Sequence, residues 1–166
     1  MKGNKKASYS DVFFMAFIAL VCALTFITGW FIFEQVNTQI QAGDHMATEG
    51  KAIMTSLNNR YVSLFDGLFL TVVVVVWLTA IVLAFMINSH PIFYFLSFFV
   101  YLVLIIIAAA FGNVFYEFTQ DSTISTAAAA FPIINLVMGN FVIFCLVVGF
   151  SVGLVMYAKS RQGYGY

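Results

Sequence analysis

Charged residues are scarce in this sequence, at 8% of 166 residues, whereas 63% of the residues are apolar. Soluble domains carry about 25% charged residues, so the composition excludes a water-soluble globule and also a solvated, disordered chain. Lys and Arg together number seven, and so do Asp and Glu. Because the net charge is zero, no basic field attracts nucleic acid, and we expect no direct nucleic-acid partner. The composition therefore indicates an integral membrane protein.

Cysteine and histidine are almost absent as well. The two cysteines, Cys22 and Cys145, both lie within apolar runs, which argues against a disulfide scaffold and a zinc-ligand pattern. The two histidines, His45 and His90, fall on opposite sides of the predicted membrane, and neither has a Cys or carboxylate at ligand spacing. We therefore expect no metal and no cofactor.

Four stretches contain no charged residue or histidine and are long enough to cross about 30 Å of hydrocarbon, which takes roughly 20 helical residues. They are residues 12–33, 68–87, 92–111 and 133–156. Lipid offers no hydrogen-bond partner to the backbone, so runs of this length must be helical. The sequence predicts one all-α membrane domain over residues 1–166, an antiparallel bundle of four transmembrane helices.

Polar tetrapeptides precede two of these stretches. Residues 8–11 and 63–66 both read S-x-x-D, ending in Asp11 and Asp66. This capping-box spacing puts an acidic side chain in the first helical turn, where it meets the positive end of the helix dipole. Helix starts are therefore predicted at both places.

The two prolines also mark helix ends. Pro91 suits the first position of the third helix, and the short connection 88–91 predicts a tight helical hairpin. Pro132 either opens the fourth helix in the same way or bends a helix that begins earlier, within 126–130.

Basic residues set the predicted orientation. Five of the seven lie near the chain ends, namely Lys2, Lys5, Lys6, Lys159 and Arg161. By the positive-inside rule both termini are cytoplasmic. The first stretch is too long for a signal peptide and lacks a cleavage site, so it is expected to be an uncleaved anchor.

The segment 34–62 is the only sizeable part outside the predicted membrane, on the outer side. Val36 and Ile40 continue the spacing of the first helix as far as Gly43, which indicates that this helix projects outward. Residues 48–59 predict a short amphipathic helix within this outer loop.

No Asp, Glu, Lys, Arg or His lies inside the four stretches. Ionisable residues in a membrane are costly and are retained for a task, so their absence argues against a proton-coupled transporter, an intramembrane metalloprotease and a voltage sensor. We expect no catalytic residue. A lipid-active enzyme using Glu49, His45 or Asp66 is the weakest hypothesis, because Asp66 is already explained as a helix start.

Two amides, Asn135 and Asn140, lie within the fourth stretch. They point roughly 140° apart on a helix, so they form no single polar stripe. An interhelical hydrogen bond is favoured over a pore lining, because a water-filled pore needs more polar positions than these.

Small residues recur at four-residue spacing, which lets helix backbones approach closely. Cys145, Gly149 and Gly153 form such a face on the fourth helix, and Ala19 with Ala23 forms a weaker one on the first. This face packs either inside the chain's own bundle or against another copy, and the sequence does not separate the two.

The last stretch carries a resemblance over about 30 residues. It reads Ala130-Phe131-Pro132-Ile133-Ile134-Asn135, continues through Gly149 and ends in Tyr157-Ala158-Lys159. It is similar to the C-terminal helix of small membrane proteins of tailless icosahedral phages with an internal membrane. The resemblance implies a virion membrane protein, located in a bacterial inner membrane or a virion internal membrane. Its termini would face the capsid shell, and its segment 34–62 would face the interior.

The predicted function is a non-enzymatic structural or assembly subunit of a larger membrane complex. Its expected partners are the lipid bilayer, other membrane or capsid proteins reached through the termini, and further copies of the chain. The alternative is an oligomeric channel or holin-like pore with a thin polar lining of Asn113, Asn135, Asn140 and Ser151.

Overall fold

The computed structural model describes residues 9–43, 46–86 and 91–162, and these residues contain helices and no strand. Side chains are described for 14–43, 46–85 and 98–159. The helices are α1 (Tyr9–Ala42), α2 (Thr48–Met86), α3 (Pro91–Gln120), α4 (Ser125–Ala129), α5 (Pro132–Gly139) and α6 (Phe141–Gln162). Four of them, α1, α2, α3 and α6, are long and apolar enough to cross a membrane. The predictions of an all-α chain and of four membrane-length helices are confirmed.

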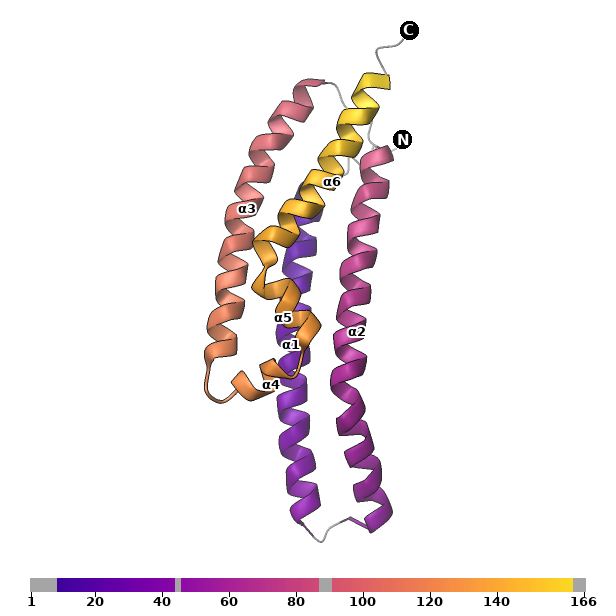
Figure 1. The fold of residues 1–166 in the computed structure, drawn as a ribbon, viewed down its shortest axis with the longest axis vertical. Helices are drawn as coiled ribbons and strands as arrows, with labels where there is room; N and C mark the ends of the chain where they lie inside the picture. The colour runs from indigo at the N-terminus through magenta and orange to yellow at the C-terminus, as the bar shows by residue number, and fades with distance from the viewer. Residues whose placement is uncertain (1–8, 44–45, 87–90, 163–166) are drawn as a thin grey trace, which may run out of the picture.

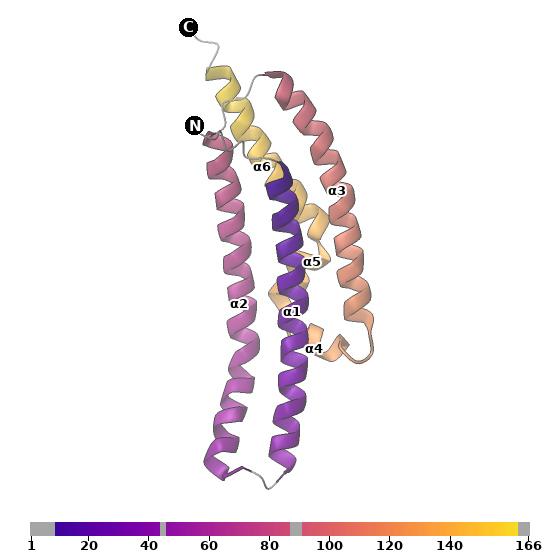
Figure 2. The same cartoon turned by 180° about the vertical axis from the view of Figure 1, so that it is seen from behind.

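Helices α1 and α2 are much longer than a membrane is thick. Their 34 and 39 residues correspond to about 51 and 58 Å, against about 30 Å of hydrocarbon. They run side by side and reach well beyond α3, α4 and α5 (Figures 1 and 2). We call residues 34–62, which form most of this projection, the stalk.

The stalk confirms one prediction and corrects two. Helix α1 projects to Ala42, as the spacing of Val36 and Ile40 predicted. Segment 34–62 is mostly helical and not a loop, and residues 48–59 are not a separate short helix, because α2 runs without interruption from Thr48 into the bundle. Side chains fasten the two helices near the tip. Gln41 Nε2 donates to the Lys51 carbonyl at 2.9 Å and to Thr55 Oγ1 at 3.0 Å, and Lys51 Nζ donates to the Gln41 carbonyl at 3.2 Å.

The structure confirms one predicted helix start and contradicts another. Pro91 is the first residue of α3, as predicted, whereas Ser63–Asp66 is not a start, because these residues lie in the middle of α2. Ser8 and the connection 87–90 lie outside the described residues, and so does the side chain of Asp11.

The predicted fourth helix, 133–156, is wrong as a single element. Pro132 opens α5, so the alternative of a bent helix running through the proline is excluded. Phe131, before the proline, leaves the helical region with φ −105° and ψ 85°, as the proline ring demands. A second break falls at Asn140, with φ −115° and ψ 32°, next to Gly139; both residue types are weak helix formers.

A short turn leads from α3 into α4. Asp121 Oδ1 accepts a hydrogen bond from the Thr123 N–H at 2.8 Å, and the Asp121 carbonyl accepts from the N–H groups of Ile124 and Ser125. The bonds from Thr123 lower the pKa of the exposed Asp121 carboxyl, because they favour its charged form.

The core lies where α4 and α5 meet α1 and α2. In Figure 1, α4, α5 and α6 pass in front of α1, with α2 and α3 on the two flanks, and Figure 2 shows α1 from the opposite side. The largest fully buried side chains are Ile27, Phe69, Phe131, Ile134, Met138 and Phe141. Two small residues of α1 belong to the same core, Ala19 and Ala23, at 7% and 0% exposure.

One aromatic side chain fixes α3 against α6. Tyr101 Oη donates to the carbonyls of Cys145 and Leu146, at 3.1 and 3.0 Å. Its ring occupies the space above Gly149, where a Cβ would lie 1.9 Å from Tyr101 Cε2. At Gly153 an added Cβ would meet nothing within 4 Å. The two glycines of the G-x-x-x-G therefore differ in what they contact.

We predict that Gly149→Ala lowers the free energy of unfolding by about 2 kcal/mol, because the methyl group displaces the Tyr101 ring from its two acceptors. Gly153→Ala is the matched control, and its change is expected to stay within about 0.5 kcal/mol or to be stabilising. Reversible unfolding in mixed micelles measures both.

The cost of Gly149→Ala should disappear in a Tyr101→Ala background, because the ring that opposes the methyl group is gone. Equal costs at Gly149 and Gly153 would show that the contact with Tyr101 does not hold these helices together.

Candidate functional site

The described part of the chain contains one buried acidic side chain, Asp66 in the middle of α2, at 4% exposure. Both of its oxygens accept hydrogen bonds from the start of α5. Oδ2 accepts from the Ile133 N–H at 3.0 Å, and Oδ1 accepts from the Ile134 N–H at 2.9 Å. Asp66 thus caps a helix that lies 67 residues further along the chain.

The first N–H groups of any helix need partners outside that helix. Pro132 has no N–H, and Phe131 at the N-cap has no side-chain oxygen to offer. The N–H groups of Ile133 and Ile134 would therefore be buried without an acceptor. The Asp66 carboxylate stabilises the start of α5 in two ways. It accepts both hydrogen bonds, and its negative charge lies at the positive end of the helix dipole.

The surroundings of Asp66 make this interaction strong. Phe69, one turn further along α2, and Phe131, next to the capped residues, are both fully buried. Apolar neighbours lower the local dielectric, which strengthens a hydrogen bond that is made and raises the cost of one that is missing. Both oxygens are engaged and shielded from solvent, so this carboxylate positions α5.

Asn135 connects α5 back to α4. Its Nδ2 donates to the carbonyl of Ala128 at 2.7 Å, and Ala128 is 2% exposed. The Ala128 carbonyl also accepts from the N–H of Phe131 at 3.1 Å, so the Asn135 side chain supplies a second hydrogen bond to an acceptor near the end of α4. Asn135 therefore joins two pieces of the interrupted segment, and its contact is within the chain.

Asn140 stands at the second break. Its Nδ2 donates to the carbonyl of Leu136 at 2.9 Å, and its own carbonyl accepts from the N–H of Phe144 at 2.9 Å. The residue closes the last turn of α5 with its side chain and begins the first turn of α6 with its backbone. Asn140 thus contributes hydrogen bonds to both the end of α5 and the start of α6.

A groove with several polar side chains in a mostly apolar lining opens beside these breaks. It has a volume of about 570 Å³ and runs between α3 and the α5–α6 junction, with Asn113, Tyr116 and Thr119 on one side and Asn135, Gly139 and Asn140 on the other. We call it the amide groove. It brings together three of the four residues considered for a channel lining. Ser151 instead lines a separate, more apolar groove of about 670 Å³ between α3 and α6.

The remaining residues singled out in the sequence lie apart from this groove. Cys145 is half-buried and packs against the core, and both thiols are free. Gly149 and Gly153 line the apolar groove that holds Ser151. His45 and His90 lie outside the described residues.

Of the residues named for a lipid-active enzyme, Glu49 and Asp66 are described. They are 17 positions apart on one continuous helix, which separates them by about 25 Å. Among the described residues no group of three His, Cys, Asp or Glu side chains could hold a metal ion.

Comparison of the chain with protein-family models, characterised proteins and solved structures finds no match. Its function must therefore be inferred from its own residues. The feature that sequence reasoning missed is the pairing of Asp66 with the start of α5. A signal for it exists, since Pro132 follows a phenylalanine that cannot cap, so the cap had to come from elsewhere in the chain.

We predict that Asp66→Ala lowers the free energy of unfolding by about 3 kcal/mol, because two N–H groups lose their acceptor inside the protein. Asp66→Asn should lose about half as much, since it keeps one acceptor oxygen and turns an NH₂ group toward the other N–H. Reversible unfolding of the purified protein in mixed micelles measures both changes.

Glu49→Gln, at an exposed acidic residue in the first turn of the same helix, is the control and should cost less than about 1 kcal/mol. A stability loss for Asp66→Ala no greater than that of this control would contradict the capping role.

Proposed function

We propose that this protein is a non-enzymatic structural or assembly subunit of a larger membrane complex. The observation that carries the proposal is the stalk, which extends beyond α3, α4 and α5 (Figure 1). It presents apolar side chains outside the span of the bundle, above all Ile53 at 62% and Leu57 at 51% exposure. Exposed apolar side chains grouped on one projecting element are typical of a contact surface for another protein.

The use of polar groups inside the bundle supports the same role. Asp66, Asn135 and Asn140 all hydrogen-bond to backbone groups of the interrupted segment. These bonds hold helices in position, which is what a subunit that anchors others in a membrane requires.

In this proposal the four long helices form an antiparallel membrane bundle with both termini on the cytoplasmic side. Five of the seven basic residues lie near the chain ends, which the positive-inside rule assigns to the cytoplasm. The beginning of α1 and the end of α6 lie toward the end of the molecule opposite the stalk tip (Figure 1). There Lys159 Nζ donates to the Phe85 carbonyl and ties α6 to α2.

The proposed assembly is a virion internal membrane. Its support is the similarity of residues 130–159 to the last helix of internal-membrane phage proteins. In such a membrane the termini would contact capsid or assembly proteins, and the stalk would face the interior. The bilayer itself and further copies of the chain are the other proposed partners.

An oligomeric channel is the second candidate. Asn113, Asn135 and Asn140 line one groove, which would give several copies of the chain a polar surface to share. Ser151 lies in the other groove, so the four residues do not form one continuous lining within a single chain.

For the assembly role we predict that the protein migrates in native membranes as a complex far larger than one chain. The double substitution Ile53→Glu and Leu57→Glu should reduce it to the size of the isolated bundle, because two charges replace the apolar contact. Native gel electrophoresis after mild detergent extraction measures the change.

The matched control adds the same two charges to the stalk at polar positions, as Ser56→Glu and Asn59→Glu, and should leave the complex intact. A complex that survives the first pair as well as the second would rule out the stalk as the contact surface.

Dye-release and ion-current measurements in liposomes distinguish the structural role from the channel. As a structural subunit, the purified protein should release no encapsulated dye and carry no ion current at any protein density. Leakage that Asn140→Leu abolishes and Ser56→Leu preserves would overturn the structural role in favour of the channel.

A further inference from the structure

The amide groove contains unused hydrogen-bonding capacity. Asn113, Asn135 and Asn140 each donate one N–H, to Glu117, Ala128 and Leu136 respectively. A primary amide has a second N–H and a carbonyl oxygen with two lone pairs. Three amides that converge on one opening of about 570 Å³ therefore retain donors and acceptors for a polar ligand, and the volume lies within the usual range for ligand sites.

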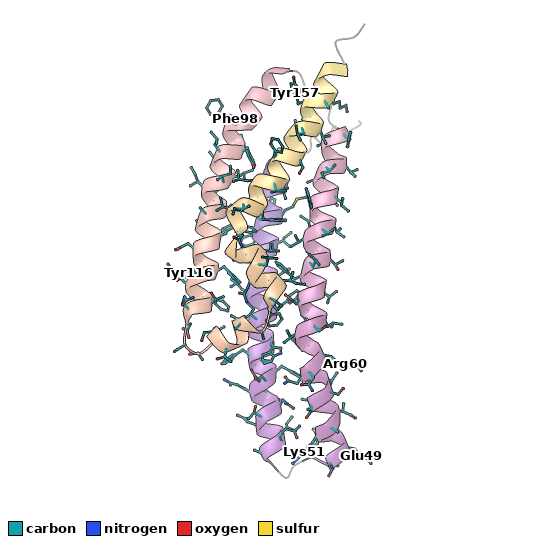
Figure 3. The ribbon with its side chains drawn as sticks, in the orientation of Figure 1. Glu49, Lys51, Arg60, Phe98, Tyr116 and Tyr157 are labelled. Carbon is teal, nitrogen blue, oxygen red and sulfur yellow. The ribbon has the colours of Figure 1, made fainter. Side chains whose placement is uncertain are left out.

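The groove lies at the height of lipid head groups. Residues 92–111 of α3 contain no charged side chain, whereas Asn113, Glu117 and Thr119 follow within the next two turns. Tyr116 is 61% exposed and lies on the outer side of α3 in Figure 3, a position typical of tyrosines at a membrane–water interface. A groove open at this depth meets phospholipid head groups.

The charge around the groove selects among head groups. Glu117 Oε1 accepts from Asn113 Nδ2 at 2.8 Å, so an exposed carboxylate stands directly beside the lining. All seven Lys and Arg residues fall within positions 2–60 or 159–161, so no basic residue lies on α3, α4 or α5. This balance disfavours an anionic head group and favours one that carries an ammonium group.

The lining also offers a place for the phosphate of a zwitterionic lipid. The first residues of α6, Phe141, Val142 and Ile143, line the groove opposite α3. The same groove also holds the amides of Asn113, Asn135 and Asn140 and the hydroxyl of Tyr116, which can donate hydrogen bonds to phosphate oxygens. A carboxylate beside the lining and these donors within it match the two charges of a phosphoethanolamine group.

We propose that the amide groove binds the head group of phosphatidylethanolamine. The ammonium group donates hydrogen bonds to amide oxygens of the lining and pairs with Glu117, while the phosphate accepts hydrogen bonds from amide N–H groups of the lining. The acyl chains remain against the apolar part of α3. This site is independent of the assembly role, because it depends on α3, α5 and α6 and not on the stalk.

The test is native mass spectrometry of the full-length protein in detergent, after delipidation and titration with defined lipids. We expect one phosphatidylethanolamine to bind at least 10-fold more tightly than phosphatidylglycerol or phosphatidylcholine. Phosphatidylglycerol lacks the ammonium group, and the quaternary ammonium of phosphatidylcholine cannot donate a hydrogen bond. Equal binding of the three lipids would overturn the proposal, as would displacement of the lipid by water-soluble phosphoethanolamine at comparable concentration.

Variants on the uninterrupted helix α3 locate the site without disturbing the breaks. Asn113→Leu should weaken phosphatidylethanolamine binding about 10-fold, and Glu117→Gln should remove most of the preference over phosphatidylglycerol. Ser151→Leu, in the apolar groove, is the matched control and should change neither quantity. Unfolding in mixed micelles checks that all three variants fold. Folded Asn113→Leu and Glu117→Gln proteins with unchanged lipid preference would place the bound lipid elsewhere and overturn the assignment.

Discussion

A helix that begins in the interior of a protein has N–H groups that need acceptors from outside that helix, and in this protein the Asp66 carboxylate accepts hydrogen bonds from two of them, those of Ile133 and Ile134. The rest of the bundle depends on this interaction. It allows the segment after α3 to turn back as α4, restart as α5 at Pro132 and continue as α6. The same interaction keeps α5 against α2, with Ile134 and Met138 buried in the core.

The two breaks also give the molecule its polar surface. An unbroken helix over 133–156 would satisfy its own backbone and would point Asn135 and Asn140 in different directions. The interruption instead brings both amides to one groove that faces Asn113 on α3. The architecture thus has two separate surfaces, the amide groove at the side of the bundle and a stalk that projects from its end. The first suits a lipid head group, and the second suits a protein partner.

Hydropathy alone predicted an all-α chain with four membrane-length helices, because uncharged runs of this length have no other stable form in lipid. The spacing of Val36 and Ile40 predicted that the first helix projects as far as Gly43, and α1 does reach Ala42. The sequence did not predict where the later helices are interrupted or that α2 is continuous from Thr48. The stalk continues α1 and α2 through polar residues, where helix periodicity is weak. The S-x-x-D pattern at residues 63–66 predicted a helix start, and this prediction was wrong because α2 runs through these residues. A capping pattern reports only local neighbours, whereas the helix that Asp66 caps begins 67 residues further along the chain. The sequence also does not show which polar tips are paired: the Tyr101 hydroxyl donates to carbonyls of α6, whereas the buried Trp77 Nε1 has no hydrogen-bond partner among the described residues.

The most direct measurement of the central claim is nuclear magnetic resonance of the full chain in bicelles with ¹⁵N-labelled isoleucine. Hydrogen bonds to a carboxylate shift amide protons downfield and protect them from exchange with solvent. The account predicts both effects for Ile133 and Ile134. It also predicts that Asp66→Asn moves these two resonances while leaving Ile124 unchanged, because the N–H of Ile124 donates to the Asp121 carbonyl. Rapid solvent exchange of the Ile133 and Ile134 amide protons would contradict the capping role of Asp66. So would amide resonances of these two residues that do not move in the Asp66→Asn variant.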